Sequence, residues 1–418
     1  MPILERLPLR RVTLGQALDA MASFPVRRAR VETIALANAE GRVLAADVVA
    51  REDVPAFRRS RVDGYAVIAE DVRAASRDRP VRLRVVGEVL MGERPAHDIS
   101  PGQAARVPTG GALPAGATGV VMVEDTELHS ETIAVFDGSD TEEFVSDIAS
   151  DVRADSLLFA AGTVLSPAAL GLACGAGVSE LQVYVPPRVG VIVTGDELVA
   201  AQHILRPGQI RDINGVVLPS ALRAMGFDPM DFGRVADERD ALAATFGRAL
   251  SECDAVVISG GSSVGERDYT PEVVAAAGVP GVIVHGIKAK PGRPALLAMI
   301  GEQPVFGLPG NPVSALTVLE AAVKPVLLRM FDKTDETPPV RAQLQRAVDV
   351  EAHLEHRIPV RLTRAGDLVV AAPLLGTSAQ MHILGFADGM LVVPLGTARI
   401  AAGSWVDVIP FSRTRTLR

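Results

Sequence analysis

The chain has few of the residues that build disulfide or metal frameworks. Only two cysteines, Cys174 and Cys253, occur in 418 residues, and both stand among apolar neighbours as core residues do. The 7 histidines are scattered without the spacing of metal ligands, so we expect no structural zinc site. No apolar run approaches the length of a membrane span, and the N-terminus lacks the apolar core of a secretion signal. The sequence therefore predicts a cytoplasmic protein with no membrane partner.

The chain also lacks an excess of positive charge. Its formal net charge is −8, which argues against general binding of nucleic acid, because such binding needs a basic face. An anionic ligand must therefore be bound by a local group of cations.

Several well-known catalytic motifs are missing. No Gly-Lys-Ser or Gly-Lys-Thr follows a glycine-rich loop, and no GxGxxG fingerprint opens a strand-helix-strand unit. No Ser-His or Cys-His pair occupies a nucleophile elbow. The sequence thus disfavours a P-loop hydrolase, a dinucleotide-dependent dehydrogenase and a serine or cysteine hydrolase.

The periodicity divides the chain into several parts. A capping box at Thr13–Gln16 and a second helical stretch at Val31–Gly41 predict a helical lead segment. Ser166 and Pro167 begin another helix, which we expect to return to the lead segment. The predicted domains are residues 1–54 with 145–182 (discontinuous, helical), 55–144 (a mostly β insert), 183–335 (α/β) and 336–418 (a small C-terminal β-barrel).

Strands alternate with helices in the α/β domain. Arg188–Thr194, Asp254–Ser259 and Pro304–Phe306 read as buried strands, whereas Asn214 and Asp237 each precede a helical pattern and are interpreted as caps. Such alternation predicts a parallel-rich sheet covered on both faces. Ligands bind at the carboxyl ends of the strands in this architecture.

The octet Gly307–Ser314 joins one of these strands to a helix. Asn311 stands at the N-cap position and Pro312 at the first helical position, so backbone N–H groups would point out of the corner and favour an anion. A well-capped structural turn is the simpler interpretation of the octet alone. Lys288, Lys290 and Arg293 lie just upstream and favour the anion site, although solvated surface charge would also explain them.

Two further strand ends carry carboxylates. Glu197 follows the first strand, and Asp268 closes the glycine-rich segment Ser259–Tyr269. Either side chain alone could cap a helix. Beside an anion site, both together indicate a bridging Mg²⁺, because carboxylates would otherwise repel the ligand.

Two segments of the β insert each place a polar side chain beside glycine. Asp63 precedes a glycine turn, and Thr109 precedes two glycines. By themselves both read as turns. If they act on the ligand of the α/β domain, they must approach it from elsewhere, such as another subunit.

These segments together resemble the molybdopterin molybdenumtransferases, the family of MoeA and the gephyrin C-terminal domain. The resemblance runs in order over nearly the whole chain, through Ser60–Val67, Val107–Glu124, Thr194–Leu198, Ser259–Tyr269, Lys290–Pro294 and Gly307–Ala315. It implies a molybdopterin-binding-type α/β domain and an elongated protomer of four parts. It also implies a homodimer with each active site at the subunit interface.

The resemblance also implies an activity. Such enzymes insert molybdenum from molybdate into adenylylated molybdopterin and release AMP, with Mg²⁺ or a similar ion as cofactor. Asp63, Glu197 and Asp268 would be catalytic, with Glu197 and Asp268 on the metal, while Asp63 and Thr109 would come from the partner subunit. The substrate-binding residues implied by the family are Thr109, Asp151, Asp237, Gly260, Gly261, Ser262, Lys288, Lys290, Arg293, Pro309, Gly310, Asn311, Pro312 and Ser314. An adenylyltransferase and the molybdoenzyme apoproteins are the implied macromolecular partners.

Two departures from the family pattern leave alternatives open. An Arg-x-x-Gly-Glu-Asp stretch is replaced by Asp147–Asp151, in which only Asp151 is kept, and Arg293 stands in place of a lysine. A molybdopterin adenylyltransferase also fits Asp268–Glu272, although such enzymes are usually a single domain. A non-catalytic pterin-binding paralogue is the third interpretation.

Overall fold

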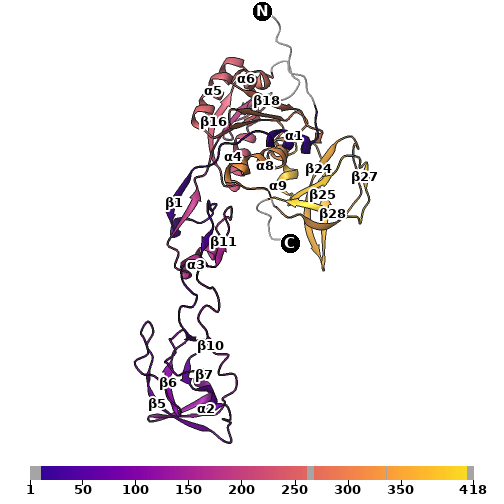
Figure 1. Cartoon of the computed structure of the whole chain (residues 1–418). Coiled ribbons are helices and arrows are strands. Elements are labelled where there is room, and N and C mark those ends of the chain that lie inside the picture. Colours follow the sequence, from indigo (N-terminus) through magenta and orange to yellow (C-terminus); the bar gives the residue numbers. More distant parts are fainter. Residues whose placement is uncertain (1–10, 261–267, 336, 412–418) are drawn as a thin grey trace, which may run out of the picture. The chain divides into compact units, whose positions relative to one another are not determined.

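The computed structural model describes residues 11–260, 268–335 and 337–411 (Figure 1). The chain forms two compact units, Thr33–Val183 and the remainder of the described chain, and each is described here by itself. Within the described ranges, no helix is both long enough and apolar enough to cross a membrane.

A six-stranded sheet forms the centre of the larger unit, in the order β16-β13-β17-β21-β20-β18. The first four strands are parallel, whereas β20 and β18 are antiparallel to their neighbours, so the sheet is parallel-rich as predicted. Strands β16 and β20 had no counterpart among the predicted strands. The strands are β13 (Arg188–Thr194), β16 (Asp228–Val235), β17 (Ala255–Ser259), β18 (Pro280–His285), β20 (Leu296–Ile300) and β21 (Gln303–Leu308).

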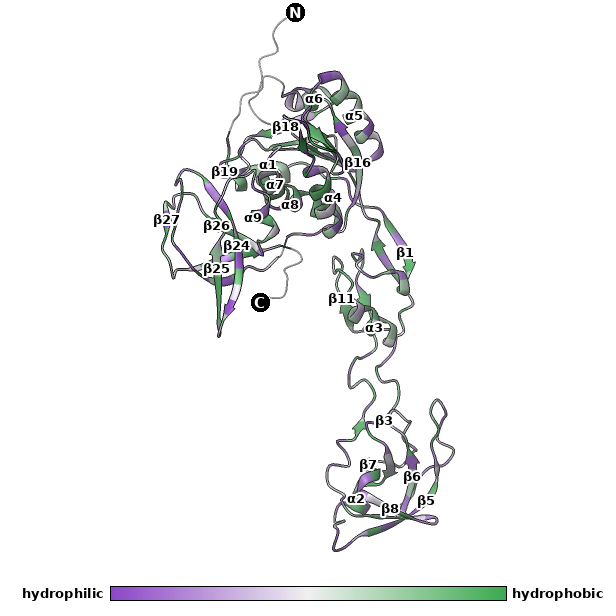
Figure 2. Ribbon diagram, turned by 180° about the vertical axis from the view of Figure 1, so that it is seen from behind, coloured by the Kyte–Doolittle hydropathy of each residue, from purple (hydrophilic) through white to green (hydrophobic). Residues whose placement is uncertain are grey.

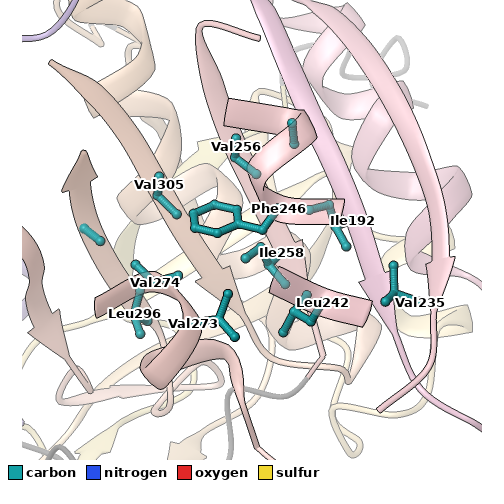
Figure 3. Close-up of a cluster of buried hydrophobic side chains, with 12 residues drawn as sticks. Ile192, Val235, Leu242, Phe246, Val256, Ile258, Val273, Val274, Leu296 and Val305 are labelled. Carbon is teal, nitrogen blue, oxygen red and sulfur yellow. The ribbon is translucent and has the colours of Figure 1, made fainter. Parts of the chain in front are cut away.

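Helices cover both faces of this sheet, also as predicted. Ile192, Val256 and Ile258 point to one face, where they pack with Phe246 in a fully buried cluster (Figure 3). Val191 and Val257 alternate with them and are equally buried on the other face. Figure 2 shows hydrophobic colour along the central strands. The helices are α4 (Asn214–Ala224), α5 (Arg239–Glu252), α6 (Thr270–Ala276) and α7 (Pro312–Val318), the last continuing through η3 (Leu319–Val323), α8 (Lys324–Leu328) and η4 (Arg329–Phe331).

The predicted helical lead segment is correct only in its first helix. Helix α1 (Leu14–Ala22) begins with the predicted capping box, in which the Thr13 Oγ1 accepts the Gln16 N–H at 3.2 Å. It buries Leu14 and Met21 against α8 and β18, so it belongs with the α/β domain and not with residues 145–182. The second predicted helix is wrong. Val31–Ala35 is a strand, β1, because its β-branched residues favour extended backbone, and only Leu36–Asn38 forms a short 3₁₀ turn, η1.

The C-terminal part is the predicted β-barrel. Strand β24 pairs with β25 and β26, while β22 and β28 complete the ring through β25 and β26. The barrel interior contains Leu344, Val360, Leu391 and Val408, all of which are buried. The strands are β22 (Val340–Leu344), β24 (Glu355–Ala365), β25 (Leu368–Pro373), β26 (Gly389–Val393) and β28 (Trp405–Pro410); β23 (Val348–Asp349) pairs with β27 (Arg399–Ile400), and α9 (His382–Gly385) precedes β26.

The Thr33–Val183 unit contains a second six-stranded sheet, in the order β7-β4-β6-β5-β9-β8. This sheet agrees with the prediction of a mostly β insert. Outside it, α3 (Pro167–Gly175) starts at Ser166, whose side chain accepts the Ala169 N–H as predicted. The sheet strands are β4 (Gly64–Val67), β5 (Val81–Glu88), β6 (Gln103–Val107), β7 (Gly119–Met122), β8 (Thr126–His129) and β9 (Thr132–Val135), and α2 (Ala69–Val72) follows β4; shorter ribbons pair β2 (Val48–Val49) with β11 (Leu157–Phe159) and β3 (Arg59–Ser60) with β10 (Val145–Ser146).

Candidate active site

The three loops that the sequence singled out leave the same edge of the central sheet. Val193 pairs with Ser259, and Ser259 pairs with Leu308, so β13, β17 and β21 end side by side. A cleft of about 1990 Å³ opens at this edge and extends to the barrel. The predicted site residues that line it are Glu197, Asp237, Gly260, Asp268, Lys290, Arg293, Pro309, Gly310, Asn311, Pro312 and Ser314.

The remaining predicted residues lie elsewhere. Lys288 is exposed and is not among the residues that line the cleft. Gly261 and Ser262 fall outside the described residues. Asp63, Thr109 and Asp151 belong to the Thr33–Val183 unit.

The strand-to-helix corner at Asn311 has the predicted backbone but different contacts. Asn311 is the N-cap of α7 and Pro312 follows at the first helical position. The Asn311 side chain does not cap the helix; its Nδ2 donates to the Ser378 Oγ at 3.1 Å. The Val313 N–H donates to the Ser378 carbonyl at 3.2 Å. Because this amide is already bonded, the cations nearby carry more of the attraction for an anion than the sequence suggested.

Those cations meet a carboxylate that the sequence did not reveal. Glu351, from the loop before β24, accepts from the Lys290 Nζ at 2.9 Å through Oε1 and from the Arg293 Nη2 at 2.9 Å through Oε2. The hydrogen bond from Lys290 is the main reason that the pKa of Glu351 lies below its ordinary value. Glu351 therefore remains ionised at neutral pH and bridges the two cations.

Asp237 lines the cleft near two other carboxylates, Asp196 and Glu197. It was interpreted as a helix cap, but α5 begins at Arg239 with Glu238 at the N-cap. Burial raises the pKa of Asp237 above its ordinary value, and the neighbouring Asp196 and Glu197 raise it further. Negative charge thus accumulates where the sequence predicted carboxylates. Asp268 also lines the cleft and accepts the Thr270 N–H through Oδ1 at 3.3 Å.

The carboxylates around Asp237 predict that removing the charge of Asp237 changes the stability of the protein in a pH-dependent way. A raised carboxyl pKa means that the folded state binds the proton more tightly, so stability falls as pH rises from 3.8 through the folded-state pKa. Asp237→Asn should therefore stabilise the protein at neutral pH, by less than about 1 kcal/mol because solvent screens a partly buried group. The gain should vanish below the ordinary carboxyl pKa. Urea unfolding of both proteins at several pH values measures it, and a gain that is independent of pH would contradict the assignment.

Asn214 is a site residue that sequence reasoning missed. It was interpreted as an N-cap, but Ile213 holds that position and Asn214 begins α4. Its Nδ2 donates to the Ser259 Oγ at 2.7 Å and to the Gly310 carbonyl at 2.8 Å, with the residue only 5% exposed. Asn214 therefore ties the end of β17 to the Gly310 corner. From sequence alone, an asparagine at the start of a helix could not be recognised as a residue that links two loops and does not cap the helix.

In the Thr33–Val183 unit, Asp63 and Thr109 are held together. Strands β4 and β6 pair Gly64 with Val107, which brings the two loops side by side. The Thr109 N–H donates to the Asp63 Oδ1 at 2.7 Å and holds the pKa of Asp63 below its ordinary value. This pair forms an ionised, exposed carboxylate at neutral pH.

The segment that departs from the family pattern has an ion pair of its own. Asp147 accepts from the Arg58 Nε at 2.9 Å, and the Asp151 N–H donates to the Val54 carbonyl at 2.9 Å. Arg58 thus lies beside this segment. It comes from an earlier loop, whereas the family pattern has its arginine within the segment itself.

The cleft is lined by both cations and carboxylates and lies at the carboxyl ends of a parallel-rich sheet, so the chain is a multidomain α/β protein with its candidate site at that edge. Comparison with known proteins identifies the family. The described family regions match in order: the MoeA N-terminal region (domain I and II) at residues 12–177, a probable molybdopterin binding domain at 190–329, and the MoeA C-terminal region (domain IV) at 341–411.

Individual relatives agree with these matches. A molybdopterin molybdenumtransferase of Nostoc sp. is 32% identical over 385 residues, covering 90% of this chain and 88% of the relative. One of Synechococcus elongatus is 34% identical over 396 residues, covering 94% and 96%. The crystal structure of a molybdopterin biosynthesis MoeA protein from Pyrococcus horikoshii is similar with a TM-score of 0.79 and 34% identity, covering 96% of this chain and 99% of that one. The chain belongs to the molybdopterin molybdenumtransferase family, which comprises transferases of molybdenum cofactor biosynthesis.

Proposed function

We propose that the protein inserts molybdenum from molybdate into adenylylated molybdopterin and releases AMP. The observation that supports this most directly is the composition of one cleft, which is lined by Lys290 and Arg293 and also by Glu197, Asp237 and Asp268. Its volume of about 1990 Å³ exceeds the usual range for a small-ligand pocket and leaves room for a nucleotide and a pterin together.

The cations suit the two anionic substrates. Molybdate is a dianion, and the adenylylated pterin carries a phosphoanhydride, so both need positive charge in a chain whose formal charge is −8. Arg293 offers a planar fork of donors and Lys290 a compact ammonium group, a combination that suits a tetrahedral oxyanion. We assign Lys290 and Arg293 to molybdate, and Gly260 and Gly310 to close approach by the nucleotide, because both line the cleft at strand ends.

The carboxylates suit hydrolysis of the phosphoanhydride with Mg²⁺. Among the residues that the structure describes, no group of three His, Cys, Asp or Glu side chains is arranged to hold a metal. Mg²⁺ commonly uses one or two carboxylates with water and substrate phosphate. Glu197 and Asp268 both line the cleft, and the pKa of Asp237, raised mainly by burial, is raised further by the neighbouring Asp196 and Glu197. Glu197 and Asp268 therefore fit the ion. When bound, Mg²⁺ would neutralise charge on the phosphates.

The residues of the chain would then orient the reactants. Asp237, whose pKa is raised, is suited to accept a proton from the attacking water as that water adds to the AMP phosphorus. The bond from this phosphorus to the bridging oxygen breaks, and AMP leaves. Lys290 and Arg293 would hold molybdate beside the pterin. The two sulfurs of the pterin dithiol would then bind molybdenum and displace an oxygen ligand, which leaves as water with the two thiol protons.

The proposal includes a homodimer in which Asp63 and Thr109 of one protomer complete the cleft of the other. It is supported by the bond between them, which fixes an ionised carboxylate on an exposed loop of the β insert. An adenylyltransferase that delivers the nucleotide and an apoenzyme that accepts the product are the expected macromolecular partners.

A purified-protein assay tests the proposal. The protein is incubated with adenylylated molybdopterin and Mg²⁺, with and without molybdate, and AMP and the molybdenum-containing pterin are quantified. We expect both products to form together and only with molybdate. Accumulation of adenylylated molybdopterin from molybdopterin and ATP would instead identify an adenylyltransferase. The absence of any product would favour a non-catalytic pterin-binding protein.

A further inference from the structure

Glu351 occupies the place where an incoming oxyanion would meet Lys290 and Arg293. We propose that the Glu351 carboxylate competes with incoming anions for this subsite. It stays bound to both cations until molybdate displaces it, and it excludes weakly bound monoanions. The proposal rests on the assignment of this subsite to molybdate. It makes Glu351, a residue of the C-terminal barrel that lines the cleft, a specificity-determining residue.

The backbone fixes both partners of this contact. Strand β19 (Ala289–Lys290) pairs in parallel with β24, with Ala289 beside Glu355 and Lys290 beside His356. On the barrel side, the Leu354 N–H donates to the Glu351 carbonyl at 3.1 Å, and the His356 Nε2 lies 3.2 Å from the same oxygen. The carboxylate is therefore directed at the two cations by strand pairing and a turn, whereas a chance surface contact would need neither.

The charges around the subsite leave it with one excess positive charge. The side chains of Lys290 and Arg293 contribute two positive charges and that of Glu351 one negative charge. Other charged side chains near the subsite neutralise one another in ion pairs: Glu355 pairs with Arg357 at 2.8 Å, and Asp349 pairs with Arg399 at 2.9 Å.

Two histidines also face this loop. Burial lowers the pKa of His356, so its imidazole is neutral at neutral pH. The His353 Nε2 lies 3.9 Å from a Glu351 oxygen on a largely exposed side chain. The neutral imidazole of His356 therefore adds no positive charge to the subsite.

An anion that replaces Glu351 must bind the cations better than this carboxylate does. A monoanion brings the same charge and must also give up its own translational freedom, so it gains nothing by the exchange. A dianion brings twice the charge and prevails. The side chains of Lys290, Arg293 and Glu351 are 50%, 39% and 42% exposed, so the ion pairs are weak enough to exchange readily.

The test compares the full chain with Glu351→Gln, which keeps the shape and removes the charge. Calorimetry near neutral pH measures the Kd for molybdate, alone and in the presence of nitrate as a monoanion. We expect Glu351→Gln to lower the Kd for molybdate by about tenfold, or about 1.4 kcal/mol, and to make binding sensitive to nitrate. Asp407→Asn is the matched control, because Asp407 forms an exposed ion pair with Arg341, also at 2.9 Å, away from the cleft.

The possible outcomes separate this inference from the proposed function. An unchanged or higher Kd in Glu351→Gln, with melting behaviour like that of the wild type, would overturn the role of Glu351 while leaving the molybdate subsite in place. Glu351→Ala provides a second variant if the glutamine variant does not fold. If neither the wild type nor either variant binds molybdate, the assignment of the subsite fails and this inference fails with it.

Discussion

Replacing Lys290 with alanine is expected to lower kcat/KM for molybdate-dependent AMP release by about 10²–10³-fold, the usual cost of removing one preorganised donor from an active site. The side chain lines the cleft and already binds a carboxylate, Glu351, at 2.9 Å, which shows that its ammonium group is directed at an anion position. Steady-state assays over a range of molybdate concentrations would show the loss, with the largest part in the KM for molybdate.

Lys288→Ala provides a control for this result. Lys288 is two residues away and exposed, and it lies outside the residues that line the cleft, so its loss should change kcat/KM by less than about threefold. Equal losses in the two variants would mean that general positive charge attracts the substrates and would contradict a defined subsite at Lys290.

The second large effect is expected at two carboxylates that line the cleft. Glu197→Gln and Asp268→Asn should each lower the rate of AMP release by about 10²–10³-fold, because each removes a charge that would help to hold Mg²⁺ on the phosphates. Both substitutions preserve shape and should leave the fold intact. The rate should respond weakly to added Mg²⁺ in both variants, whereas the wild type should saturate.

Asp240→Asn serves as the control here, since Asp240 is an exposed carboxylate on α5 that pairs with Arg239 and does not line the cleft. Turnover should be unchanged in that variant. Unchanged turnover in Glu197→Gln and Asp268→Asn as well would favour the interpretation of the protein as a non-catalytic scaffold.

The convergence of the three loops could be predicted from sequence because it follows from local rules. Buried apolar runs identify β13, β17 and β21, and adjacent parallel strands necessarily end at one edge. The Asn311 corner could also be predicted, since the preferences of Asn at an N-cap and Pro at the first helical position are local. The positions of Glu197 and Asp268, which follow β13 and β17, around one cleft can be inferred from the first of these facts.

The partners of these residues could not be predicted. Glu351 lies 61 residues after Lys290, and Ser378 lies 67 residues after Asn311, both in the barrel. Their positions depend on the pairing of β19 with β24, and a two-residue strand leaves no periodic signal. The strand at Val31–Ala35 was mistaken for a helix for a related reason, because its pairing partner β12 (Glu180–Tyr184) is far away in the sequence.

The central claim is that one cleft holds molybdate on its cationic side and the pterin nucleotide across from it. A crystal of the protein with molybdate, AMP and Mg²⁺, recorded at a wavelength where molybdenum scatters anomalously, tests this directly. The account predicts a molybdenum peak whose oxygens contact Lys290 and Arg293, with Glu351 turned away and the AMP phosphate near Glu197 and Asp268. A molybdenum peak elsewhere, with the bonds from Glu351 to Lys290 and Arg293 intact, would contradict it.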